Sequence, residues 1–289
     1  MIKLLTLVFL IPVVSFSQTI KYRQYKPGEI TRYKLTSEIY HNGKSAGKTV
    51  SIAGSKVVND SGYFSEEIRR LSKISISVQD TINLDSIGIK VKPCKIFLSP
   101  NGKVLLPKLA IPEMVGDITD LNTFYVAISP ALNAQKISVK KPKHINDKTI
   151  KGNFADSVTI LYGTDCIRVM QNLVSATKRY SVIKTGFEPP SFSCLLPLLD
   201  TIEKKTFDYS NNFQMIRKGT DNKVNLVWGV ETFTIITDID NKNGQILAAT
   251  MTNFLNLRMR YNASKDLKTY AAEIPFTITR NLKLELLAQ

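Results

Sequence analysis

The side chains that most often perform catalysis are few in this 289-residue chain, and they are scattered. Histidine occurs only as His41 and His144. Neither histidine lies in the His-Glu-x-x-His spacing that puts two zinc ligands on one helix face. Ser55 lacks the Gly-x-Ser-x-Gly setting that exposes a nucleophile on a sharp turn, and no glycine-rich phosphate loop or dinucleotide fingerprint is present. The sequence therefore contains no recognisable catalytic residue and implies no cofactor.

The acidic residues do not predict a metal site. The segment 238–244 has Asp at alternate positions, as a calcium-binding loop does, but Lys242 stands where an oxygen ligand is needed and no Glu closes the loop. The adjacent carboxylates of Glu66 and Glu67 would project to opposite faces of a strand. We therefore expect no bound metal, and we expect that the protein is not an enzyme.

The first seventeen residues have the pattern of a secretory signal peptide. Lys3 precedes an apolar run over 4–14, and the small residues Ser15 and Ser17 occupy the −3 and −1 positions of a cleavage site. The run is shorter than the ~20 residues that span a bilayer, and no later run is long enough. We expect signal cleavage after Ser17 and an exported protein, periplasmic or secreted, with no transmembrane segment after cleavage.

An exported chain can form disulfides, and this chain has three cysteines, Cys94, Cys166 and Cys194. Three cysteines leave one unpaired, and spacing alone does not select the pair. We favour a disulfide between Cys166 and Cys194. The alternative is three buried thiols that act as small hydrophobic side chains.

The chain is strongly basic, with 39 Lys and Arg against 24 Asp and Glu and a formal net charge of +15. Such a surface can meet anionic lipid headgroups or acidic glycans, and the alternative is a merely soluble surface. We expect no nucleic-acid partner, because the basic residues are not interleaved with aromatic ones. One stretch is expected to form a basic surface loop, with Lys136, Lys140, Lys141, Lys143, Lys148 and Lys151.

The last third of the chain, 224–287, predicts three long strands in succession. Mostly apolar residues occupy alternate positions from Phe233 to Ile239, from Leu247 to Tyr261 and from Tyr270 to Leu286. Such alternation is typical of antiparallel sheet with one apolar and one polar face. The segment 240–244 ends in Asn-Gly, which supplies the positive φ of a tight turn.

Shorter alternating segments over 33–39, 50–57, 74–78 and 96–98 predict an antiparallel meander in the first half. Helical spacing appears over 112–130 and again over 192–202, where Pro197 makes the helix short or kinked. The segment 165–180 fits either a helix or a strand, and we favour a strand because β-branched residues flank it.

These patterns predict a mainly β fold, a curved antiparallel meander sheet that is half-barrel or barrel-like, with two or three short helices. The expected domains are a signal peptide over 1–17 and a single β-rich domain over 18–289. The alternative division is into two similar halves, 18–152 and 153–289.

The order of elements, together with the turn segments at 41–44 and 101–103, resembles the half-barrels of lipoprotein carriers. The layout is also similar to that of uncharacterised exported bacterial β-proteins. The resemblance implies a hydrophobic space for an acyl chain or lipid. The candidate ligand-binding residues on the apolar concave face are Phe233, Ile235, Met251, Leu255, Leu257, Met259, Phe276 and Ile278. The alternative is that these side chains fill an ordinary solid core.

We therefore predict a non-enzymatic exported binding or carrier protein for an apolar or amphiphilic ligand such as a lipid. The alternative is a structural or protein-interaction module of the cell envelope, with an envelope protein as its partner, that docks through an edge strand or the basic loop.

Overall fold

The computed structural model describes residues 17–19, 24, 26–60, 63–77, 79–85, 94–98, 104–105, 136–138, 143–147, 151–154, 158–161, 167–188, 213–218, 223–264 and 266–288. Over these ranges the chain forms strands and turns and contains no helix. Accordingly, no helix of this part is long and apolar enough to cross a membrane. The helices expected at 112–130 and 192–202 lie outside the described residues.

The described residues form strands of very different length. The longest ones include those predicted from alternation in the last third of the chain. The bounds are β1 Ser17–Thr19, β2 Ile30–His41, β3 Lys44–Asp60, β4 Tyr63–Ile76, β5 Thr81–Asn83, β6 Cys94–Leu98, β7 Val104–Leu105, β8 Lys136–Ser138, β9 Lys143–Asp147, β10 Lys151–Phe154, β11 Val158–Leu161, β12 Ile167–Ala176, β13 Tyr180–Glu188, β14 Phe213–Lys218, β15 Val224–Asp240, β16 Ile246–Ala263 and β17 Ala272–Leu286.

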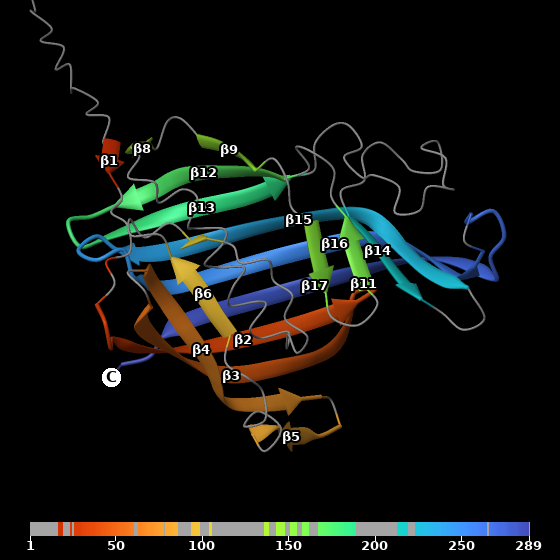
Figure 1. The fold of residues 1–289 in the computed structure, drawn as a ribbon, viewed down its shortest axis with the longest axis horizontal. Helices are drawn as coiled ribbons and strands as arrows, with labels where there is room; N and C mark the ends of the chain where they lie inside the picture. Colours follow the sequence, from red (N-terminus) through yellow and green to blue (C-terminus); the bar gives the residue numbers. More distant parts are fainter. Residues whose placement is uncertain are drawn as a thin grey trace, which may run out of the picture.

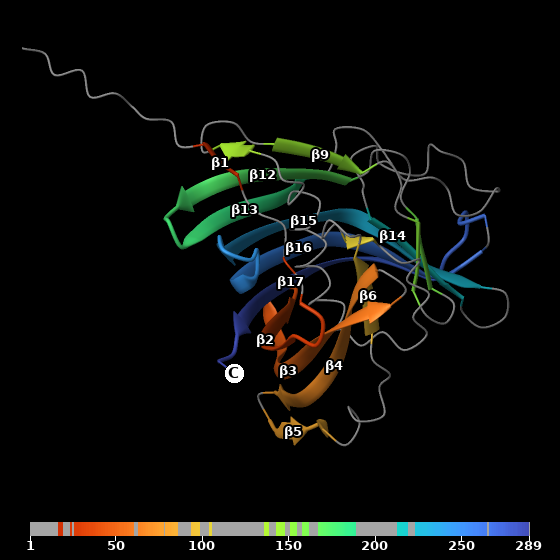
Figure 2. The same ribbon diagram turned by 60° about the vertical axis from the view of Figure 1, so that its left-hand side comes forward.

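Fifteen of these strands belong to one sheet whose strand pairs are all antiparallel. Its main path runs β10-β11-β14-β15-β16-β17-β2-β3-β4-β6-β7, so the sheet has free ends and does not close. Figure 1 shows the long strands side by side, and Figure 2 shows that the sheet curves. The predicted curved antiparallel meander is confirmed. The pairing of β17 with β2 joins the end of the chain to its beginning within the sheet.

The predicted Asn-Gly turn at 41–44 forms as expected, whereas the turn segment 101–103 lies outside the described residues. Asn42 and Gly43 between β2 and β3 have φ values of 50° and 76°. Positive φ at both positions gives the local twist that a tight hairpin needs. The amide of Asn42 also donates to the carbonyl of Thr277 at 2.9 Å, and its Oδ1 accepts from the Thr277 amide at 2.8 Å. This turn is therefore attached to β17.

Strand β16 defines two faces of the sheet. From Met251 to Arg258 buried and exposed residues alternate without interruption, with the odd positions buried. We call the face of the odd β16 positions the inner face and the opposite one the outer face. Register places Leu282 and Leu284 of β17 on the inner face, and Leu35 of β2 lies opposite Leu284. All three leucines are buried, so the inner face contributes to the hydrophobic core.

Two sequence predictions are decided by the strand pairing. The strand favoured over 165–180 is confirmed as β12. The prediction of a single basic loop over 136–151 is wrong for three of its lysines. Lys136, Lys143 and Lys151 lie in β8, β9 and β10. Lysine does not prevent strand formation, because the backbone and not the side chain forms the pairing hydrogen bonds. The remaining members, Lys140, Lys141 and Lys148, lie outside the described residues.

Candidate functional site

The eight apolar residues predicted to bind a ligand share the inner face. Met251 lies opposite Ile235 on β15, and Leu255 and Leu257 lie opposite Ile278 and Phe276 on β17. The two remaining members, Phe233 and Met259, lie at positions of the same parity on β15 and β16. The most compact part is a cluster that we call the apolar floor, formed by Val227, Leu255 and Leu257 with Met259, Phe276 and Ile278 packed against it.

The apolar floor is not uniformly buried. Leu257 is 2% exposed and Leu255 is 6% exposed, whereas Met259, Phe276 and Ile278 are half-buried. Further along the same two strands, Ile274 lies opposite Met259 and is 46% exposed. The floor therefore reaches the molecular surface at the β16–β17 hairpin end.

Strand β15 changes its neighbour beside the floor. It pairs with β14 over Val224–Gly229 and with β13 over Phe233–Asp240, which leaves 230–232 between the two partners. Gly229 has φ +152°, and a Cβ there would lie 2.1 Å from the carbonyl oxygen of Asn256. Only glycine permits this close approach of two backbones.

Three polar residues cross the inner face at the border of the floor. We call Glu231, Asn253 and Arg280 the polar row. Asn253 and Arg280 are directly opposite on β16 and β17, and Glu231 lies opposite the next inner residue, Leu255. The Asn253 Nδ2 donates to Glu231 Oε1 at 2.8 Å and to the Thr232 carbonyl at 3.2 Å. The sidechain amide thus holds the carboxylate in place.

The polar row is electrostatically unusual, because Asn253 is buried and the two ionisable groups beside it, Glu231 and Arg280, are half-buried. Burial raises the pKa of Glu231 above its ordinary value of 4.5, against the smaller lowering by the hydrogen bond from Asn253. Burial also lowers the pKa of Arg280. Loss of solvent disfavours the charged form of either group. Partly buried ionisable groups on a largely apolar face are candidate contacts for the polar part of a ligand.

Further buried polar atoms on the inner face have no hydrogen-bond partner within the described structure. They are Asn253 Oδ1 and the hydroxyls of Thr185 and Thr237. Thr185 lies opposite Ile235, and Thr237 lies opposite Ala249, so both face the same side as Asn253. A buried polar atom without a partner costs free energy. Such atoms can be satisfied by a ligand that brings its own donors or acceptors.

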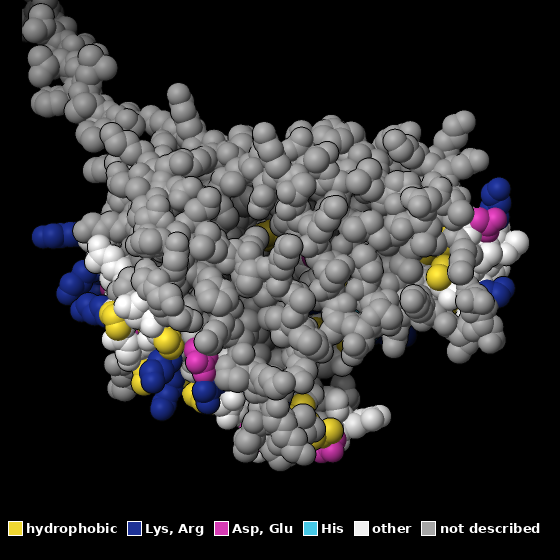
Figure 3. Space-filling view, in the orientation of Figure 1, with side chains coloured by type: hydrophobic (Ala, Val, Ile, Leu, Met, Phe, Trp, Pro, Cys, Tyr) yellow, Lys and Arg dark blue, Asp and Glu magenta, His cyan; other side chains and the backbone are white. Residues whose placement is uncertain are grey.

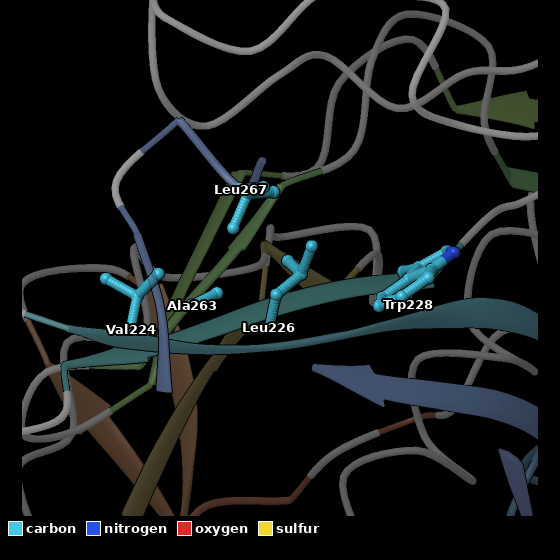
Figure 4. Packing of buried hydrophobic residues seen from close by; sticks show 5 residues of the cluster. All are labelled: Val224, Leu226, Trp228, Ala263 and Leu267. Atoms are coloured by element: carbon cyan, nitrogen blue, oxygen red, sulfur yellow. The ribbon is translucent and has the colours of Figure 1, made fainter. Parts of the chain in front are cut away.

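A second buried cluster lies where β15 and the β16–β17 hairpin meet. Val224, Leu226, Trp228, Ala263 and Leu267 pack together, and Figure 4 shows their side chains grouped around β15. Leu267 has φ +58°, so the connection between β16 and β17 turns sharply there. This cluster attaches the connection to the sheet.

Arg260 ties that connection together. Its guanidinium lies 5.1 Å from the ring centre of Trp228 and 4.6 Å from that of Tyr270. It also donates to Glu273 Oε2 at 2.8 Å and to the Leu267 carbonyl at 3.2 Å. Burial raises the pKa of Glu273, but the hydrogen bonds and charges of Arg260 and Arg258 outweigh burial and hold that pKa below its usual range.

The other predicted positions are not gathered at this site. Cys166 and Cys194 lie outside the described residues, and Cys94 begins β6 opposite Ile68. His41 ends β2, whereas His144 lies in β9 opposite Met170. Across the described ranges no group of three or more His, Cys, Asp or Glu is placed to hold a metal.

The polar row was not predicted, although the sequence carries a signal for it. Asn253 interrupts the apolar series of β16, and Arg280 stands between Ile278 and Leu282 in β17. A polar residue at a position that alternation assigns to the buried face indicates a buried polar group. Glu231 precedes the regular alternation of β15, and its placement depends on the register with β16.

No protein-family model and no curated protein matches the chain. Among solved structures, it is similar to one described as lipid–protein interactions in lipovitellin, with 10% identity and a TM-score of 0.45. That comparison covers 92% of this chain and 26% of the other, so this chain spans about a quarter of its length. OmpT, an outer membrane protein of Vibrio cholerae, aligns with 9% identity and a TM-score of 0.18 over 91% of this chain and 100% of that one. At these scores neither likeness carries a functional conclusion.

Proposed function

We propose that this chain is a non-enzymatic exported binding or carrier protein for an apolar or amphiphilic ligand such as a lipid. The observation that supports the proposal most is the apolar floor, where Leu255, Leu257, Phe276 and Ile278 from two adjacent strands form one continuous surface. Ligand sites are mostly apolar with a few polar groups that fix orientation. The inner face has this composition.

The polar row gives the proposed ligand an orientation. The alkyl part would lie on the apolar floor, and the polar part would lie against Glu231, Asn253 and Arg280. Asn253 Oδ1 is buried and available to accept a hydrogen bond, which favours a ligand with a hydroxyl, amide or ammonium donor. The location outside the cytoplasm rests on the signal-peptide pattern of residues 1–17.

A pair of matched phenylalanine substitutions tests this function. Phe276 lies on the floor, whereas Phe254 lies on the outer face of the neighbouring strand and is 41% exposed. We would titrate the full-length protein with 1-N-phenylnaphthylamine, whose fluorescence rises in apolar surroundings. Phe276→Asn is expected to weaken binding roughly 10- to 100-fold, the usual effect of losing one large apolar contact. Phe254→Asn is expected to bind as the unmodified protein does.

Circular dichroism would establish that both variants keep their sheet. If Phe276→Asn does not fold, Ile278→Thr removes a half-buried floor contact with a residue that suits strands. Equal binding by the floor variant and the outer-face variant would contradict the proposal, as would the absence of any probe binding by the unmodified protein.

A further inference from the structure

The β16–β17 hairpin ends in exposed apolar side chains on the inner face, at Tyr261 and Ile274, and in arginines on the outer face, at Arg258 and Arg260. We call residues 258–274 the hairpin tip. Tyr261, Tyr270 and Ile274 are 37%, 44% and 46% exposed, and Tyr261 and Ile274 both adjoin Met259 on the inner face, as its next inner neighbour along β16 and as its partner on β17. Figure 1 places this connection at the right-hand end of the molecule, and Figure 3 shows hydrophobic and basic side chains together at that end.

The charge of the hairpin tip is positive. Its described residues include three basic side chains, Arg258, Arg260 and Lys268, against the two acidic ones, Asp266 and Glu273. Both acidic groups are engaged within the tip. Glu273 is paired with Arg258 at 3.2 Å and with Arg260 at 2.8 Å. Asp266 accepts hydrogen bonds from the Ser264 hydroxyl and the Lys268 amide. Lys268 remains exposed, and the side chain of Arg258 is 64% exposed.

The hairpin tip is held in a defined shape. The guanidinium of Arg260 is stacked between Trp228 and Tyr270, and Leu267 is buried against β15. The Ser264 amide donates to the Thr269 carbonyl at 2.8 Å, and the Thr269 amide donates to the Ser264 hydroxyl at 3.1 Å. A preorganised surface binds without the entropic cost of ordering it.

The hairpin tip is continuous with the apolar floor. Exposure rises along the same two strands, from Leu257 at 2% through half-buried Met259 and Phe276 to Ile274 at 46%. Tyr261 is the next inner-parity position of β16 after Met259. Tyrosine has an apolar ring and a polar hydroxyl, and basic side chains are attracted to anionic headgroups. These features together fit the interface of an anionic bilayer.

We propose that the hairpin tip docks on the surface of an anionic lipid membrane. The inference extends the proposed function, since a tip seated in the headgroup region would place the exposed end of the floor against lipid. It does not depend on that function, because docking can be measured without any bound ligand.

Vesicle flotation tests the proposal with substitutions of matched type and exposure. The tip variant combines Tyr261→Ser with Ile274→Ser. The control variant combines Tyr180→Ser with Ile82→Ser, whose side chains are 41% and 51% exposed on β13 and β5. Each purified full-length protein would be mixed with vesicles of phosphatidylglycerol and phosphatidylethanolamine, or of phosphatidylcholine alone.

The unmodified protein and the control variant are expected to float with the anionic vesicles and to dissociate as salt is raised. The affinity of the tip variant for the anionic vesicles is expected to fall by about tenfold or more. Trp228 is the only tryptophan, so quenching by brominated lipid reports on the tip alone. Quenching is expected with the control variant and not with the tip variant.

Flotation of the tip variant equal to that of the control would overturn the proposal. Failure of the unmodified protein to float with anionic vesicles would do the same and would point to a protein partner. The result is separable from ligand binding. A variant that loses flotation but still binds 1-N-phenylnaphthylamine has lost only the docking surface. A variant that loses probe binding but still floats has lost only the ligand site.

Discussion

Gly229 is the residue on which the close contact of β15 and β16 depends most. A Cβ at this position would lie 2.1 Å from the Asn256 carbonyl oxygen, and the φ of +152° is strained for any side chain. Overpacking and positive φ each cost about 1–3 kcal/mol. Gly229→Ala is therefore expected to lower the free energy of unfolding by roughly 2–6 kcal/mol in urea denaturation.

Gly186 of β13 is the matched control, because a Cβ there meets no atom within 4 Å and its φ is not positive. Gly186→Ala is expected to change stability by less than about 1 kcal/mol. Similar midpoints for the two alanine variants would show that the approach at Gly229 is not required.

The raised pKa of Glu231 predicts an unusual pH dependence of the free energy of unfolding. Its pKa is raised in the folded chain, so the folded protein keeps a proton that the unfolded chain has already lost. Stability contributed by this group is therefore present below the ordinary value of 4.5 and falls as pH rises through the folded pKa. Glu231→Gln keeps an acceptor for Asn253 and removes the titration.

Urea unfolding of the unmodified protein and of Glu231→Gln would be followed from pH 4 upward. The variant is expected to gain stability relative to the unmodified protein as pH rises. A difference that stays constant with pH would contradict the assignment of a raised pKa to this carboxyl. Asn253→Ser would serve as a control that loses the amide while the carboxyl remains.

At the scale of elements, Arg260 joins the hairpin tip to the sheet. Lysine preserves the charge but cannot stack as a plane between Trp228 and Tyr270 or donate to Glu273 and Leu267 in the same way. Arg260→Lys is expected to lower the free energy of unfolding by about 1–2 kcal/mol. The emission of Trp228 should shift to longer wavelength as water reaches the ring.

Arg258→Lys is the matched control for Arg260→Lys. Arg258 pairs with the same Glu273, yet its side chain is 64% exposed and its contact is longer, at 3.2 Å. Exposed pairs contribute little, so a change below about 0.5 kcal/mol and an unshifted emission are expected. Equal effects of the two lysine variants would show that stacking does not stabilise the tip.

Alternation in the sequence was sufficient to predict the long strands and their apolar face. The period of two places Met251, Leu255 and Leu257 together whatever the fold of the remainder, and Asn-Gly fixed the turn at Asn42. Strand order was not predictable in this way. The pairing of β17 with β2 joins residues more than two hundred positions apart, and local pattern carries no information on it.

The candidate site, too, could be predicted only in part from the sequence. Its apolar members followed from the period of β16 and β17, whereas the polar row needed the register between three strands. Glu231 meets Asn253 only because Glu231 lies opposite Leu255. The loop predicted over 136–151 was wrong in part for a related reason. Lysine content indicates how polar the side chains are, but not whether the backbone pairs with another strand.

For the molecule as a whole, the curved, unclosed sheet offers two contrasting surfaces. The outer face of β16 carries exposed Thr250, Thr252, Asn256 and Arg258, whereas the inner face is largely apolar and holds the polar row. A solid core would need no ionisable groups at Glu231 and Arg280, and it would not reach solvent at Ile274. The proposed amphiphile, lying along the inner face, would account for both features.

Native mass spectrometry of the protein recovered from its producing cells would show whether the inner face holds an amphiphile. The unmodified chain is expected to carry a discrete adduct of lipid mass, which organic extraction would release and identify. Phe276→Asn should lose the adduct, and Phe254→Asn should keep it. A clean ligand-free mass for a folded, unmodified chain would contradict the account and favour an envelope protein-interaction module instead.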